Sequence, residues 1–154
     1  MPEKKVAGNV QIVLMQERHL DALAELERLC FSQPWSREGL AAEQQDSTAC
    51  FLVAEWEDTV VGYAGMHCVL DEAYVANVAV HPAFRQRGIG ILLMQDLERC
   101  AKESGAAFLS LEVRASNQAA QALYQSCGFQ ELGVRKGLYD SPKEDGFILT
   151  KTFS

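Results

Sequence analysis

Residues 85–90, Arg85-Gln86-Arg87-Gly88-Ile89-Gly90, decide the fold because they join a predicted strand to a predicted helix. The apolar run before them, residues 75–80, is typical of a strand, and residues 91–104 are typical of a helix. A glycine-containing turn here leaves backbone N–H groups unpaired at the positive end of a helix, a geometry that binds phosphate. The two glycines let a ligand approach the backbone, and the two arginines add positive charge. By itself the turn is equally compatible with an ordinary loop, and it is neither a Walker loop nor a G-x-G-x-x-G fingerprint.

The segments that follow this turn narrow the choice of fold. Residues 108–114, Phe-Leu-Ser-Leu-Glu-Val-Arg, alternate between apolar and polar side chains and predict a strand. Residues 117–127 predict a short helix, which Gly128-Phe129 closes. The remaining patterns predict strands at 10–14, 51–55, 60–69, 74–80, 130–139 and 147–153, and helices at 18–31, 36–44 and 90–104. The order β-α-α-β-β-β-α-β-α-β-β predicts a mixed α/β (α+β) domain, with helices flanking a mostly antiparallel central sheet.

Two motifs in these segments resemble the GNAT superfamily of N-acetyltransferases. Residues 85–90 match its pyrophosphate motif R/Q-x-x-G-x-G/A, and residues 117–129 match its N-x-x-A-x-x-L-Y-x-x-x-G-F segment. Residues 111–117 (Leu-Glu-Val-Arg-Ala-Ser-Asn), 77–80 and 34–36 (Pro-Trp-Ser) are similar to RimI enzymes, the bacterial N-terminal acetyltransferases of a small-subunit ribosomal protein. The resemblance runs from about residue 10 to residue 152, and it implies one acetyl-CoA-dependent domain over residues 1–154.

Composition limits the environment and the partners of the chain. Its 154 residues are 48% apolar, which suits one folded domain, and no apolar stretch reaches the ~20 residues that span a bilayer. Residues 1–9 lack the apolar centre of a signal peptide, and the five cysteines show no C-x-x-C spacing. We therefore expect a cytoplasmic protein with reduced thiols, no membrane contact and no metal site.

The net charge of −7 argues against direct binding of nucleic acid through a basic face. It is compatible with a basic peptide or a cationic amine as partner, although acidic surfaces mainly confer solubility. We expect a protein N-terminus, that of a ribosomal protein, as the partner. We expect a monomer or weak dimer.

The reaction that the resemblance implies is attack of a free amine on the thioester of acetyl-CoA. It needs a base for the ammonium, a donor for the carbonyl oxygen and an acid for the departing thiolate. Period-two alternation puts Glu112 on the polar face of its strand, and the resemblance assigns it as the general base. The alternative is a solvent-facing carboxylate paired with Arg114.

Tyr124 is the acid that the resemblance implies, since it lies on the helix that follows the Glu112 strand. A tyrosine among alanine and leucine is otherwise more often an aromatic packed on the core. Tyr74 is a rival base, because some N-terminal acetyltransferases use a tyrosine near this position.

The resemblance assigns the acetyl-CoA site to backbone groups and to the glycine turn. In the family the 74–80 strand separates from the Glu112 strand, so main-chain groups of Val78, Ala79 and Val80 become free for pantetheine. The Val78 N–H is the expected donor to the thioester oxygen. The other expected contacts are Arg85, Gln86, Arg87, Gly88, Ile89, Gly90, Ile91 and Asn117. Asn117 is equally interpretable as the N-cap of the helix that follows it.

Trp35, Glu72, Tyr74 and Tyr139 are the expected substrate contacts. The alternative role of Trp35 is hydrophobic anchoring. The alternative for Asp71 and Glu72 is a solvent-exposed turn. The chain departs from the RimI pattern at Leu138-Tyr139-Asp140, where that family often has two tyrosines followed by proline. A GNAT enzyme acting on lysine or a small amine therefore remains a rival, as does a non-catalytic acetyl-CoA-binding module.

Overall fold

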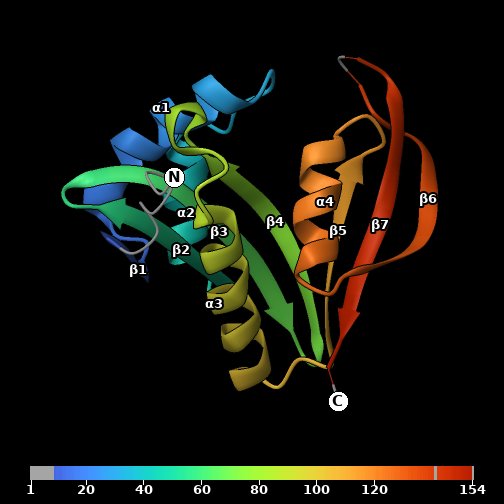
Figure 1. Cartoon of the computed structure of the whole chain (residues 1–154). Coiled ribbons are helices and arrows are strands. Elements are labelled where there is room, and N and C mark those ends of the chain that lie inside the picture. Colours follow the sequence, from blue (N-terminus) through green and yellow to red (C-terminus); the bar gives the residue numbers. More distant parts are fainter. Residues whose placement is uncertain (1–8, 141, 154) are drawn as a thin grey trace.

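Seven strands form one sheet in the order β1-β2-β3-β4-β5-β7-β6 in the computed structural model, which describes residues 9–140 and 142–153 (Figure 1). The strands are β1 Val10–Leu14, β2 Ala49–Trp56, β3 Thr59–Val69, β4 Glu72–Val80, β5 Phe108–Arg114, β6 Gln130–Tyr139 and β7 Glu144–Thr152. The α-helices are α1 Leu20–Cys30, α2 Arg37–Gln45, α3 Ile89–Glu103 and α4 Gln118–Ser126, and short 3-10 turns lie at Glu17–His19 and Pro82–Phe84. The predicted order of elements is confirmed.

Local chemistry explains most of the element boundaries. The Ser36 hydroxyl accepts the Gly39 N–H at 3.0 Å and caps α2, and the Asn117 side chain accepts the Ala120 N–H at 3.0 Å and caps α4. Strand β7 differs from the expectation, because it begins at Glu144 and not at 147, so the turn before it is shorter than predicted. Ser141 of that turn and residues 1–8 lie outside the described residues.

The central feature of the sheet is the pair β4–β5, its one parallel pair, joined at only three positions. Glu72, Ala73 and Tyr74 pair with residues 108–110, and no further pairing follows toward the ends of the two strands. Every other neighbouring pair is antiparallel. Figure 1 shows β4 and β5 diverging from this paired end, with α3 and α4 on the same side of the opening. The expected separation of the two strands is confirmed.

Strand β4 also bends, because it carries an extra residue against β3. The register runs from Gly65 opposite Asn77 to Met66 opposite Val75, which leaves Ala76 without its own partner. Such a bulge twists the strand and redirects the neighbouring backbone groups. It lies in the stretch of β4 that has already left β5.

Two apolar clusters hold the sheet, one on each face. Helix α3 buries Leu93, Met94 and Leu97 with β5, β7 and the end of α4, and α1 and α2 bury Leu23 and Leu40 against Phe51 and Tyr63 of the opposite face. Within the described residues, no helix is both long and apolar enough to cross a membrane.

Candidate active site

A cleft of about 490 Å³ opens where β4 and β5 separate. Its walls come from the loop after α1, from residues 75–78 of β4, from residues 111–114 of β5, from α4 and from the end of β6. Of the expected site residues, it brings together Trp35, Val78, Glu112, Asn117, Tyr124 and Tyr139.

Glu112 lies in the middle of β5, between the buried side chains of Leu111 and Val113. Its side chain is 39% exposed, and its Oε2 lies 2.7 Å from Nε of Arg135 on β6. The alternative pairing with Arg114 is not what the structure shows. Arg114 instead lies 3.1 Å from Glu144. The Glu112 carboxylate, paired with the exposed Arg135, lines the cleft.

Tyr124 of α4 is 7% exposed and packs edge-on against Phe129 at 5.9 Å between ring centroids. No group in the described part of the chain hydrogen-bonds to its hydroxyl. Burial, with contributions from Cys127 and Tyr139, raises the pKa of Tyr124 above the ordinary tyrosine value of 10.0. The phenol therefore keeps its proton at neutral pH and can donate it.

The backbone of β4 meets the cleft at Val78. The Val78 N–H donates to Oδ1 of Asn77 at 3.1 Å, beside the bulge. Ala79 is buried in the core on the α1 side, and the Val80 carbonyl accepts Nε of Arg85 at 3.0 Å. Neither Ala79 nor Val80 lines the cleft, so the structure favours Val78 among the three expected backbone contacts.

The glycine turn has the backbone that an anion-binding loop needs. Gln86 and Gly88 have φ values of 63° and 85°, and Gly88 is the N-cap of α3 without a side-chain cap bond. Left-handed residues on either side of Arg87 and an uncapped helix start leave N–H groups available to phosphate. This arrangement fits the expected pyrophosphate contact.

Other residues of the turn have structural duties that sequence did not reveal. Gly90 is helical, and a Cβ at this position would lie 3.0 Å from Cδ2 of Leu123, so this glycine lets α3 approach α4. The Arg85 guanidinium also donates to Sγ of Cys30 at 3.4 Å, and the Arg87 guanidinium lies 5.6 Å from the ring centroid of Phe84. Ile89 is buried in the core.

Tyr139 and Trp35 both line the cleft, Tyr139 from the end of β6 and Trp35 from the loop after α1. The Arg114 guanidinium lies 4.4 Å from the centroid of the Tyr139 ring and donates to the carbonyls of Asp140 and Pro142 at 3.0 and 2.9 Å. Arg114 thus fixes the turn that presents Tyr139, a role that its place in the sequence did not suggest.

Glu72 and Tyr74 lie elsewhere. Both belong to the paired end of β4, where Tyr74 is opposite Ser110, and neither lines the cleft. The Tyr74 hydroxyl donates to Glu72 at 2.9 Å, and the tyrosine is 49% exposed. This position does not fit the expected substrate contacts or the rival base.

Sequence reasoning missed a polar cluster behind the cleft. Glu27 of α1 is fully buried and bonds to Tyr63, to Asn77 and to the backbone N–H of Trp35. One pattern could have revealed it: Glu27 follows Leu20 and Leu23 at the helical spacing of the apolar face. A carboxylate on an apolar face needs buried partners.

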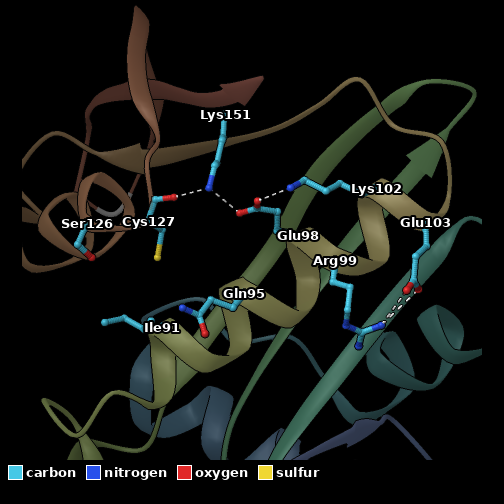
Figure 2. A pocket seen from close by; sticks show the side chains of 9 residues that line it. All are labelled: Ile91, Gln95, Glu98, Arg99, Lys102, Glu103, Ser126, Cys127 and Lys151. Carbon is cyan, nitrogen blue, oxygen red and sulfur yellow. Dashed lines mark hydrogen bonds and ion pairs between the residues drawn. The ribbon is translucent and has the colours of Figure 1, made fainter. Parts of the chain in front are cut away.

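A second cavity of about 490 Å³ lies between α3 and the C-terminal end of α4 (Figure 2). Figure 2 shows Lys151 of β7 reaching across it to Glu98 Oε1 and to the Cys127 carbonyl, both at 2.8 Å. Lys102 lies 3.1 Å from the other oxygen of Glu98. Ile91, an expected cofactor contact, lines this cavity and not the cleft. Lys151 thus connects β7 to α3 and to the end of α4.

One group of possible metal ligands lies away from the cleft, between α2 and β3. His67 Nε2 is 2.7 Å from Glu43, and His67 Nδ1 is 3.6 Å from Asp46 and 3.0 Å from the Thr48 hydroxyl. Both ring nitrogens therefore already have protein partners.

Comparison with known proteins gives a consistent result. The model of the acetyltransferase (GNAT) family matches residues 20–129. A [ribosomal protein bS18]-alanine N-acetyltransferase of Escherichia coli (strain K12) is 34% identical over 142 residues, which are 91% of this chain and 95% of that one.

Two solved structures extend the comparison. The crystal structure of the ribosomal-protein-S18-alanine N-acetyltransferase from Escherichia coli aligns with a TM-score of 0.86 at 33% identity, covering 94% of each chain. The fold is also that of the PaiA N-acetyltransferase from Thermoplasma acidophilum in complex with coenzyme A. That alignment has a TM-score of 0.80 at 21% identity and covers 94% of this chain and 99% of that one.

Proposed function

Because the chain belongs to the acetyltransferase (GNAT) family, we propose that it transfers acetyl from acetyl-CoA to the N-terminal alanine of ribosomal protein bS18. The observation that carries the proposal is the separation of β4 and β5, which places Val78, Glu112 and Tyr124 around one cleft. The substrate follows from relatives of this name at about one-third identity over nearly the whole chain. The proposed enzyme is cytoplasmic.

Each chemical requirement of the transfer has a candidate group in the cleft. Glu112 accepts the proton of the substrate ammonium, and the resulting amine attacks the thioester carbonyl carbon. The Val78 N–H, which also donates to Asn77 Oδ1, shares its hydrogen with the carbonyl oxygen as that oxygen gains negative charge. The C–N bond forms, the C–S bond breaks, and the Tyr124 hydroxyl gives its proton to the departing sulfur. The nitrogen loses its second proton to solvent as the amide forms, and the Tyr124 oxygen regains a proton from solvent. A base, an N–H donor and an acid are sufficient, so the proposal involves no metal.

The glycine turn and Asn117 would hold the rest of acetyl-CoA. The left-handed residues and the uncapped start of α3 suit the pyrophosphate, and Asn117 lines the cleft while it caps α4. Capping uses only the Asn117 oxygen, which leaves its amide NH₂ for a ligand.

An N-terminal amine suits this cleft better than a lysine does. A free α-amine has a pKa near ~8, against ~10.4 for lysine, so far more of it is neutral at pH 7. A single carboxylate in contact with an arginine is therefore a sufficient base for an N-terminus. The net charge of −7 should also increase the association rate of a basic peptide.

A pair of peptides tests the proposal. We expect a short basic peptide with a free N-terminal alanine to be acetylated at its first nitrogen. The same peptide with a blocked N-terminus and one internal lysine should react at least about tenfold more slowly. Mass-spectrometric mapping locates the acetyl group. Acetyl found mainly on lysine or only on a small amine would favour the rival enzymes, and binding of acetyl-CoA without transfer would favour the non-catalytic module.

A further inference from the structure

Glu27 is a buried carboxylate that the proposed reaction does not use. Its side chain is 0% exposed, at the back of the cleft. Among the described residues no lysine, arginine or histidine forms an ion pair with it. A buried charge without a cation is costly unless hydrogen bonds compensate for it, so the groups that it holds are informative.

Three donors meet the Glu27 carboxylate, and each comes from a different element. The backbone N–H of Trp35 donates to Oε1 at 2.8 Å. The Tyr63 hydroxyl and the Asn77 amide donate to Oε2 at 2.5 and 2.6 Å. Burial and the contact with Glu27 raise the pKa of Tyr63, so its hydroxyl remains a donor.

Two of these donors belong to the walls of the cleft. Trp35 lies in the loop between α1 and α2, which lines the cleft and which we call the substrate loop because Trp35 is an expected substrate contact. Asn77 adjoins the bulge in β4, and its Oδ1 accepts the Val78 N–H at 3.1 Å. The orientation of the Asn77 amide is fixed by its neighbours, since a carboxylate requires the NH₂ group on one side and the Val78 N–H requires the oxygen on the other.

We propose that Glu27 is a positioning residue, whose carboxylate sets both the substrate loop at Trp35 and the Val78 N–H that stabilises the reacting oxygen. Through Oε1 it holds the loop, and through Oε2 and Asn77 it holds the peptide unit of Val78. This inference rests on the proposed function, in which the Val78 N–H donates to the thioester oxygen. It joins peptide binding and acetyl transfer in one buried group.

Replacement of Glu27 by glutamine tests the hydrogen bonds that the carboxylate accepts without changing the volume of the side chain. Glu27→Gln keeps the shape but offers one oxygen and one NH₂ group, and so cannot accept all three donors. We expect kcat to fall at least about tenfold and the KM for the alanine peptide to rise at least about tenfold. The Kd for acetyl-CoA should stay within about threefold of wild type, since the glycine turn is not in contact with Glu27.

Tyr63→Phe is the matched control. It removes the hydrogen bond to Glu27 and the one that the Asn77 amide donates to the Tyr63 hydroxyl at 3.1 Å, but it leaves Glu27 in contact with Trp35 and Asn77. We expect changes of less than about threefold in kcat and KM. Asn77→Ala is the second variant. It removes the link to Val78 and one donor to Glu27 but leaves the Trp35 bond to Oε1, so kcat should fall while the peptide KM stays near wild type.

The exposure of the substrate loop can be measured independently of turnover, by quenching of Trp35 fluorescence. In a Trp56→Phe background Trp35 is the remaining tryptophan, and Glu27→Gln should increase its quenching by acrylamide. If wild type fails to acetylate the alanine peptide, the proposed function fails, while this quenching still tests the hold on the loop. A folded Glu27→Gln protein with wild-type kcat, KM and quenching would overturn the inference, as would equal losses in Tyr63→Phe.

Discussion

Replacement of Tyr124 by phenylalanine isolates the proton that the cleft is expected to supply. The change removes one oxygen atom and keeps a ring that is 7% exposed and packed on Phe129. Because no described residue hydrogen-bonds to the hydroxyl, no bond is lost. We therefore expect the free energy of unfolding to change by less than about 0.5 kcal/mol.

We expect Tyr124→Phe to slow the chemical step. Removal of a general acid typically slows turnover about 10²-fold or more, which corresponds to roughly 2.7 kcal/mol of transition-state stabilisation. This loss is about five times the allowed change in stability, so the two effects are separable. The acetyl-CoA affinity should be unchanged, since the phenol is expected to contact only the sulfur.

The assay is release of free thiol in single-turnover and steady-state reactions with the alanine peptide. The pH profile adds a second measurement. Tyr124 acts when it is protonated, and its pKa is raised above 10.0, so wild-type kcat should not decline as pH rises toward that value. Equal rates for wild type and Tyr124→Phe, with product release shown not to limit turnover, would reduce Tyr124 to a packing residue. A descending limb below pH 10 that only wild type shows would contradict the effect of burial.

Two further substitutions test the base and the phosphate turn. Glu112→Gln should slow turnover by roughly 10²–10⁴-fold, while the melting temperature changes little, because the exposed pair with Arg135 contributes at most about 1 kcal/mol. Tyr74→Phe should be fully active, and the opposite pattern in rate assays would transfer the role of base to Tyr74. Gly88→Val forces a β-branched residue to a φ of 85° at the start of α3. It should weaken acetyl-CoA at least tenfold, about 1.4 kcal/mol, by calorimetry, and unchanged affinity in the folded variant would refute the phosphate assignment.

Local patterns predicted the elements well, because short-range chemistry determines them. Strand β5 has the bounds that alternation predicted, and Ser36 and Asn117 cap the helices that follow them. Strand β7 begins three residues before its predicted start at 147, because its pairing with β6 extends to Glu144, opposite Tyr139. Tertiary pairing overrides turn residues in such a hairpin.

The parts of the site that sequence could not predict depend on contacts between distant segments. Alternation predicted which face of β5 bears Glu112, but its Arg135 partner follows from the placement of β6 beyond β7. The end of the β4–β5 pairing likewise decides that Val78 meets the cleft and that Tyr74 does not. Gly90 shows the same limit, since its motif position suggested a ligand contact and its neighbour is Leu123.

The two carboxylates of the cleft show how environment divides their tasks. Glu27 is fully buried and accepts three hydrogen bonds. A proton added to its carboxylate would point at one of these donors and break that bond. Glu112 forms an ion pair with Arg135, which is itself 61% exposed and can turn toward solvent. A base must exchange partners during each turnover, whereas a group that holds the walls of a site must not. This difference supports the proposal that Glu112 takes the substrate's proton while Glu27 keeps Val78 and the substrate loop in place.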